Sequence, residues 1–333
     1  MLTVAFLPLL ANRPMKINRS IYKSYFVTRR EIKILSNFFC LKCLACLMLF
    51  VISGFLKAEE LNVKYNMPNR VQSDYMQGLL KHALSYSGKK YTYSTTNETY
   101  SKPRVMESLI SGEITVMWGG TTSQMEEDFI PIRIDAYRGL MSHRILLIRK
   151  GEQSRFDQIN SLEDFQKITL GQVRTWQDSE ILEKAGFKVV KITKKPGLFY
   201  MLDGGRFDAF PRGANEAWSE MAAFPNLNLD VEKNLVLIYP LPTYFFVSKH
   251  RPEVAKDIEK GLEQSIKDGS FDAYFYGSKE IRDVLRIADL PHRKAFNITN
   301  PFLPKETPLD RKELWISIEQ LKQKTEELKL NQD

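Results

Sequence analysis

Cysteine is missing from most of this chain. The three cysteines, Cys40, Cys43 and Cys46, all lie within the first 58 residues, so the remaining 275 residues contain none. This absence excludes a disulfide framework, a thiolate metal site and a cysteine nucleophile from that part of the chain.

Catalytic and metal-binding motifs are also scarce. The four histidines are scattered, and none of them has a partner at the spacing typical of zinc ligands. The sequence has no Gly-x-Ser-x-Gly nucleophile elbow and no phosphate-binding loop. We therefore expect no catalytic residue, no metal and no other cofactor.

An excess of positive charge is absent from the same region. The whole chain has a formal net charge of +8, but its first 58 residues hold nine Lys and Arg against one acidic residue. Residues 59–333 are left with 39 basic and 39 acidic residues. A nucleic-acid-binding domain would concentrate positive charge in its folded part, so we exclude nucleic acid as a partner.

The N-terminal stretch has the pattern of an export signal. Residues 44–56 form an apolar run, preceded by Lys42 and other basic residues, and Ala58 is a small residue at the expected cleavage site. The run is shorter than the roughly 20 residues that span a bilayer. We predict that this signal peptide exports the protein. The alternative is an uncleaved signal that anchors the protein to the membrane.

Strand-like and helix-like segments alternate from Leu61 onward, which predicts an α/β protein with parallel sheets flanked by helices. Two strongly apolar strands, at 144–149 and 244–248, divide the chain. Two lobes joined by these crossing strands fit the pattern better than one long sheet. Residues 311–330 form a charged amphipathic tail.

The segment LDGGRFDAFPRG, at 202–213, carries the most informative basic residue. A Gly-Gly turn precedes the short apolar run 207–210, which stops at Pro211 with Arg212 at its tip. Strand ends in open α/β sheets gather where ligands bind. A guanidinium group there is suited to a carboxylate or phosphate. The alternative is an ordinary surface salt bridge.

Five ordered segments resemble those of a known family. They are ESLISGE at 107–113, LEDF at 162–165, LDGGRFDA at 202–209, YFFVSK at 244–249 and KDGSF at 267–271. The set is similar to type II periplasmic solute-binding proteins of the amino-acid-binding group (family 3), over nearly all of 59–300. The resemblance implies two lobes, each a mostly parallel sheet flanked by helices, and a ligand cleft that closes about a two-strand hinge near 144–149 and 244–248.

The resemblance also implies a division of the chain. Residues 1–58 are the N-terminal extension and signal peptide. The first lobe comprises 59–147 with 246–333, which includes the C-terminal helices, and the second lobe comprises 148–245.

Two charges depart from the family pattern. In amino-acid-binding members, the arginine of a G-x-T-x-T-x-E-R segment in the first lobe grips the ligand carboxylate, and an acid in the second lobe meets the ammonium group. Here Glu127 stands at the arginine position, and Arg212 lies where the acid is usual. We expect a ligand acidic group to be held from the second lobe instead.

Candidate ligand contacts lie at strand ends and in the loop after Gly171, which precedes a helix whose N-terminus favours anions. They are Tyr65, Asn66, Trp118, Gly120, Thr121, Gln172, Trp176, Tyr200 and Arg212. Trp118 would stack on a flat or apolar part of the ligand. The alternatives are core packing for the aromatic residues and helix capping by Asp178.

We predict a monomeric, exported solute-binding protein that captures a small polar or anionic solute, amino-acid-like or related, for a membrane permease of an ABC transporter. The alternative from another class is a sensory module that acts on a membrane signalling partner. A dehydratase-type enzyme on the same fold, using an acid such as Glu127, is less expected.

Overall fold

A computed structural model describes residues 60–66 and 72–330 of the 333-residue chain. Residues 59–333 form one compact unit. The predicted export signal and the three cysteines lie outside the described residues. Of the helices in the described ranges, none combines the length and apolar character needed to cross a membrane.

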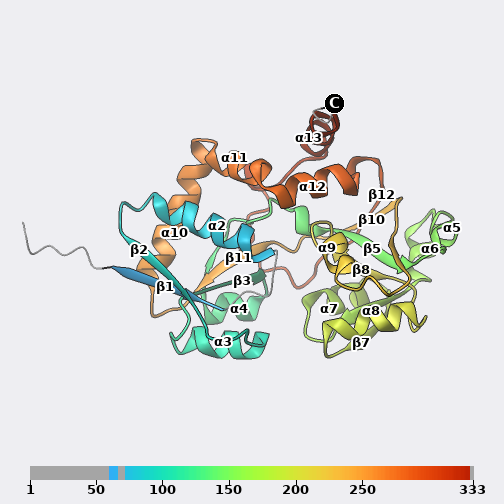
Figure 1. Cartoon of the computed structure of the whole chain (residues 1–333), viewed down its shortest axis with the longest axis horizontal. Coiled ribbons are helices and arrows are strands. Elements are labelled where there is room, and N and C mark those ends of the chain that lie inside the picture. The colour runs from blue at the N-terminus through green and yellow to red at the C-terminus, as the bar shows by residue number, and fades with distance from the viewer. Residues whose placement is uncertain (1–59, 67–71, 331–333) are drawn as a thin grey trace, which may run out of the picture. The chain divides into compact units, whose positions relative to one another are not determined.

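The first lobe contains two small sheets and the helices around them (Figure 1). Its strands are β1 (Leu61–Tyr65), β2 (Tyr91–Thr95), β3 (Val116–Gly120), β4 (Ile130–Ile132) and β11 (Thr243–Val247). Its helices are α2 (Gln72–Ser85), α3 (Lys102–Ile110), α4 (Ser123–Asp128), α10 (Pro252–Lys267) and α11 (Ser270–Gly277). Strands β1 and β2 are parallel, whereas β11 runs antiparallel between β3 and β4.

Helix α10 shows how the sequence builds this lobe. Its apolar residues Val254, Ile258 and Leu262 recur every fourth position and are buried together on one face. Gly261 lies on the same face, where a Cβ atom would be 1.9 Å from the carbonyl oxygen of Ala83 in α2. Only glycine permits this close approach of the two helices.

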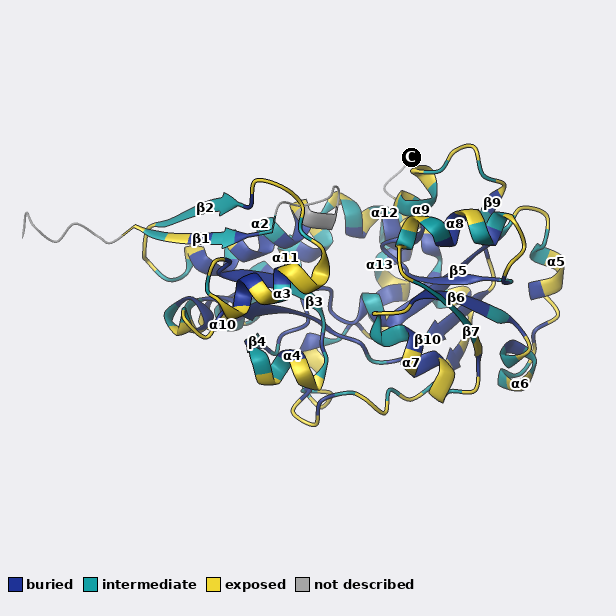
Figure 2. Ribbon diagram, turned by 90° about the horizontal axis from the view of Figure 1, so that it is seen from below, coloured by how far each residue is buried: buried dark blue, intermediate teal, exposed yellow. Residues whose placement is uncertain are grey.

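The second lobe contains a five-stranded sheet in the order β12-β10-β5-β8, with β9 beside β5, and the parallel pair β6-β7. Its strands are β5 (His143–Arg149), β6 (Thr169–Val173), β7 (Lys188–Ile192), β8 (Phe210–Gly213), β9 (Leu229–Val231), β10 (Leu235–Ile238) and β12 (Lys294–Asn297). Its helices are α5 (Gln153–Phe156), α6 (Leu162–Gln166), α7 (Gln177–Lys184), α8 (Lys195–Asp203) and α9 (Ala217–Ala222). Figure 2 shows β5 and β10 buried among the surrounding elements.

The α/β class with two lobes is confirmed, but the sheets are mixed rather than mostly parallel. Strand β5 is antiparallel to β8, β9 and β10, and β11 is antiparallel to both of its neighbours. Each of these two strands directly follows a crossing from the other lobe. Parallel neighbours in a sheet must be joined by a long crossover connection. A strand that directly follows a crossing from the other lobe is free of this requirement and can run antiparallel to its neighbours.

The lobe boundaries differ from the expected ones. Strands β5 and β11 do not cross between lobes, since each is paired inside a single lobe. The chain crosses between the lobes in two segments without strands, 133–142 and 239–242, and again between α11 of the first lobe and β12 of the second. Strand β12 also departs from the expectation for 246–333, since it pairs in parallel with β10 of the second lobe.

Asp135 ties the two crossing segments together. Its buried carboxylate accepts hydrogen bonds from the backbone N–H groups of Tyr137, at 3.0 Å, and Gly139, at 2.7 Å, in its own segment. It also accepts one from the N–H of Thr243, at 3.2 Å, where the second crossing ends. Burial raises the pKa of Asp135 to about 6, and the hydrogen bonds oppose that rise.

The charged amphipathic tail contains helix α13 (Ile318–Leu330), which packs on α12 (Lys279–Ala288). The hydroxyl of Thr325 donates to the carbonyl oxygen of Leu285 at 3.2 Å. Part of the tail surface is therefore covered by the chain itself.

Candidate ligand-binding site

A cavity of about 440 Å³ lies between the two lobes. Its first-lobe wall includes Asn66, Tyr100, Lys102, Trp118, Gly119 and Gly120. Its second-lobe wall includes Arg144, Trp176, Asp178, Arg212 and Glu216, and Met141 and Leu241 of the crossing segments close one side. This volume suits a small molecule, and strand ends of both lobes supply the wall.

Trp118 and the glycines that follow it shape the first-lobe wall at the end of β3. The Trp118 ring lies 5.7 Å from Tyr65 and 6.2 Å from Phe245, centroid to centroid, and remains half-buried on the cavity side. A Cβ atom at Gly119 would meet no other atom within 4 Å. The cavity therefore extends to the backbone of Gly119, beside the Trp118 indole, which packs against Tyr65 and Phe245.

Asn66 fixes the loop that leads into α3. Its side-chain oxygen accepts hydrogen bonds from the N–H of Tyr100 at 2.9 Å and from the hydroxyl of Thr96 at 3.2 Å. Helix α3 then begins at Lys102, which lines the cavity. By fixing this loop, Asn66 at the end of β1 sets the position of the Lys102 backbone.

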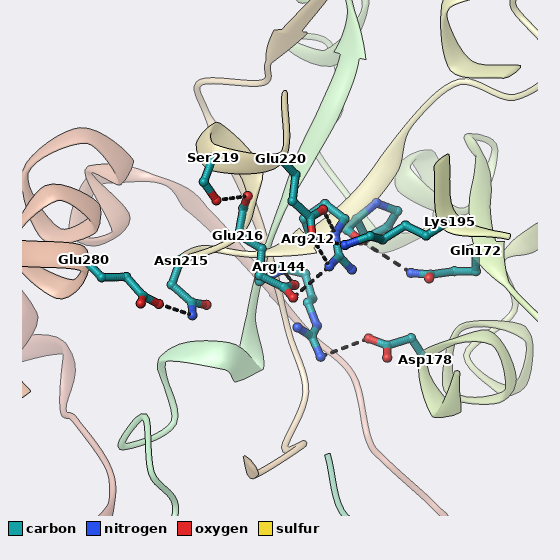
Figure 3. A network of polar contacts seen from close by, with 12 residues as sticks. Arg144, Gln172, Asp178, Lys195, Arg212, Asn215, Glu216, Ser219, Glu220 and Glu280 are labelled. Carbon is teal, nitrogen blue, oxygen red and sulfur yellow. Dashed lines mark hydrogen bonds and ion pairs between the residues drawn. The ribbon is translucent and has the colours of Figure 1, made fainter. Parts of the chain in front are cut away.

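Arg212 lies inside β8 and is tightly paired (Figure 3). Its guanidinium bonds Glu220 through Nε at 2.6 Å and Nη2 at 2.9 Å, and Nη2 lies 2.7 Å from Glu216 Oε1. It also covers the ring of Trp176 at 4.7 Å from the centroid. Burial alone lowers the pKa of Arg212, but attraction by the two carboxylates outweighs it and raises the pKa overall.

Lys195 completes this cluster by approaching Glu220 Oε1 at 2.7 Å. Two cations and two carboxylates then balance one another. The charge of Arg212, expected to meet a ligand acid, is already matched by protein carboxylates. The arginine instead supports the wall of the cavity by holding Trp176 in place.

Arg144 forms a second neutral pair in the same wall. Its Nη2 lies 2.9 Å from Asp178 Oδ1, and the hydroxyl of Tyr239 accepts from Arg144 Nε at 3.1 Å while donating to Asp178 at 2.6 Å. Burial lowers the pKa of Arg144, and attraction by Asp178 raises it above the ordinary value. Asp178 is therefore an ion-pair partner, while the helix-capping position of α7 belongs to Trp176.

Five of the nine predicted contacts line the cavity, namely Asn66, Trp118, Gly120, Trp176 and Arg212. Tyr65 is buried behind Trp118 and donates its hydroxyl hydrogen to Gln77 at 2.8 Å. Thr121 is buried as well, and its hydroxyl donates to Glu126 at 2.7 Å. Both residues support the wall from within the lobe.

Gln172 and Tyr200 also lie away from the cavity wall. Gln172 belongs to β6 and is fully buried, and its amide nitrogen is 3.5 Å from the carbonyl oxygen of Pro211. Tyr200 is 60% exposed and packs edge-on against Phe224. It faces neither the core nor the cavity, because α8 turns this position outward.

Sequence reasoning missed several residues of the wall, above all Lys102, Arg144, Asp178 and Glu216. A Lys-Pro pair at a helix start is a weak local signal for Lys102. The partnership of Arg144 with Asp178 joins two elements that are far apart in sequence, so no local pattern reveals it.

The acid considered for dehydratase chemistry lies elsewhere. Glu127 is exposed on α4 and is not among the residues that line the cavity. Across 60–66 and 72–330, no group of three His, Cys, Asp or Glu is placed to hold a metal ion.

Glu280 marks a polar contact between α12 and the second lobe (Figure 3). Its Oε1 accepts from Asn215 at 3.1 Å, whereas Glu280 Oε2 and Asn215 Oδ1 are buried acceptors without a hydrogen-bond partner among the described residues. Burial raises the pKa of Glu280 to about 7, with Glu216 and Asp74 adding to the rise and Asn215 and Tyr137 opposing it.

Stability should therefore depend on the protonation of Glu280. Because its pKa in the folded state lies above the ordinary 4.5, this group favours folding at low pH, and the benefit is lost as pH rises from 4.5 to about 7. We expect Glu280→Gln to flatten the urea-unfolding stability profile by on the order of 2 kcal/mol across that window. Glu319→Gln, at an exposed position of α13, is the control, and parallel profiles for Glu280→Gln and wild type would contradict the assignment.

Several solved structures are similar to this chain. An ancestral arginine-binding protein bound to arginine is 22% identical, with 66% of this chain and 97% of that one covered and a TM-score of 0.45. An amino acid ABC transporter substrate-binding protein of Streptococcus pneumoniae bound to L-arginine is 15% identical, with coverages of 68% and 95% and a TM-score of 0.47. An ancestral amino-acid-binding protein, a precursor of cyclohexadienyl dehydratase, is 16% identical, with coverages of 68% and 98% and a TM-score of 0.45.

These neighbours are amino-acid-binding proteins, like the group that the sequence motifs resemble, and the Streptococcus pneumoniae protein belongs to an ABC transporter. No family model matches the chain, and no curated protein matches it. Identities of 22% or less, with these TM-scores, leave the ligand of this chain to be inferred from its own cavity.

Proposed function

We propose that this chain is an exported solute-binding protein of the family 3 type, which captures a small polar or anionic solute between its lobes and delivers it to a membrane permease. The observation that carries this proposal is the cavity itself, in which two half-buried indoles and two neutralised arginines, each paired with carboxylates, surround a space of about 440 Å³. Because both arginines of this wall are already paired with carboxylates, they are suited to shaping a ligand site rather than to transferring protons.

Movement of the lobes about the two irregular crossing segments would close the site over the solute. Residues 133–142 and 239–242 are not strands, and the Asp135 carboxylate links them. Hinges are commonly a few such residues between rigid elements. Export to the periplasm would be directed by the segment within 1–58, and delivery to a permease follows from the family resemblance.

A ligand panel tests this function. Amino acids, organic acids, small peptides and polyamines are screened by thermal shift, and hits are titrated calorimetrically. We expect saturable binding, weakened about 10-fold or more in Trp118→Ala, because buried tryptophans contribute strongly to binding.

Trp218→Ala is the matched control, since Trp218 is partly buried in α9 and does not line the cavity. Equal loss of affinity in both variants would contradict a specific role for Trp118 in ligand binding. A panel in which no compound binds would contradict the proposed function.

A further inference from the structure

Lys102 is the charged residue of the cavity that lacks a protein partner. Within 60–66 and 72–330 its ammonium group makes no hydrogen bond or ion pair. The other charged residues of the wall are all paired, Arg144 with Asp178 and Arg212 with Glu216. Because Lys195 and Glu220 balance each other behind Arg212, the described residues of the wall carry one net positive charge together.

The Lys102 side chain is exposed to water while the cavity is open, so its charge becomes costly only when the site closes over it. Although the residue is exposed at the cavity wall, protein packed around the ammonium group lowers its pKa, and the attraction of Asp178 opposes this only in part. Asp178 lies on the other lobe and is already bonded to Arg144 and Tyr239. Closing the lobes with Lys102 unpaired would desolvate it further, which is unfavourable unless a counter-charge enters with the ligand.

We propose that Lys102 binds an acidic group of the ligand and that the protein selects solutes carrying one net negative charge. The inference rests on the proposed solute-binding function. A neutral or zwitterionic solute would leave the lysine charge unbalanced, and a dianion would leave a negative charge unpaired. A single carboxylate on a ligand whose remaining charges are balanced neutralises the closed cavity.

The assignment moves the acid-binding role from the second lobe to the first. Arg212 was the sequence-based candidate, but its guanidinium already has three contacts of 2.6–2.9 Å with Glu216 and Glu220. A ligand acid at Arg212 would have to compete with both carboxylates. At Lys102 it meets no such competition, because Asn66 and Tyr100 fix the loop before the lysine without engaging its side chain.

Two pairs of probes of nearly equal shape test the proposal on the purified chain. L-glutamate is compared with L-glutamine, and 3-phenylpropionate with 3-phenylpropanamide, by titration calorimetry at pH 7. In each pair the first compound carries one net negative charge and the second is neutral. For a pair that binds, we expect the anion to bind about 10-fold or more tightly, as for a hydrogen bond to a charged group.

Variants of Lys102 separate this inference from the general function. Lys102→Gln should abolish the preference for the anion while keeping the weaker affinity for the neutral partner, and Lys102→Arg should retain the preference. Lys188→Gln, at an exposed position outside the cavity, should behave as wild type. An unchanged preference in Lys102→Gln, or tighter binding of the amides by wild type, would overturn the role of Lys102 and leave solute binding intact. Failure of all four probes and of the wider panel would overturn the function and the inference with it.

Discussion

Arg212→Met is expected to lower the free energy of unfolding by about 3–5 kcal/mol. The substitution removes the guanidinium but keeps an apolar stem of similar length. Glu216 and Glu220, whose side chains are only 10% and 11% exposed, would then be left buried without their main counter-charge. Urea unfolding at pH 7, followed by circular dichroism, measures the loss.

The origin of this loss can be tested by removing the stranded charges. Glu216→Gln and Glu220→Gln combined with Arg212→Met should restore a large part of the stability. Arg104→Met is the control, because its exposed pair with Glu98 is worth less than about 1 kcal/mol. If Arg212→Met unfolds like wild type but loses ligand affinity, the guanidinium is a ligand anchor rather than a structural residue.

Asp135→Ala is expected to cost about 3 kcal/mol or more, because three backbone N–H groups would lose their acceptor in a buried region. Two of these groups belong to one crossing segment and the third ends the other. The loss should therefore also loosen the connection between the lobes. Urea unfolding gives the stability, and hydrogen exchange at Gly139 and Thr243 reports the local opening.

Asp203→Ala provides the comparison for Asp135. Asp203 accepts one hydrogen bond, at 2.9 Å, from the exposed backbone N–H of Asn228, and its loss should cost about 1 kcal/mol. Equal effects of the two substitutions would show that the crossing segments are not held by Asp135.

Elements with strong local patterns could be predicted from the sequence. The helix at Pro252–Lys267 follows from its apolar spacing and from the proline at its start. The strands Ile130–Ile132 and Lys294–Asn297 were missed. They are short, the first contains Pro131 and the second is largely exposed, so long-range pairing with β11 and β10 decides their conformation.

The strand that carries Arg212 begins and ends later in the sequence than its local apolar pattern predicts. The apolar run at 207–210 predicts a strand, yet β8 spans Phe210–Gly213 and includes the arginine. Phe207 instead packs over Gly171, where a Cβ atom would be 2.3 Å from its ring. Pro211 is tolerated because β8 lies at the end of its sheet.

The sequence predicted the position of some residues of the candidate site but not how its charges are paired. Strand ends can be located from apolar runs and glycines. This reasoning correctly predicted that Trp118 and Gly120 line the cavity. Charge balance depends on pairs formed across the fold, such as Arg144 with Asp178, and these require the tertiary structure. That balance transfers the acid-binding role from Arg212 to Lys102.

Titration calorimetry of wild type beside Gly119→Phe tests most directly whether the cavity binds a solute. Gly119 lines the cavity, and a Cβ atom there would lie more than 4 Å from every atom outside its two chain neighbours, so a large side chain has room to occupy the site. We predict saturable binding of at least one probe by wild type, and no binding by a Gly119→Phe variant that unfolds at the same temperature. Equal affinities in the two proteins, or no saturable binding by wild type, would contradict ligand binding between the lobes.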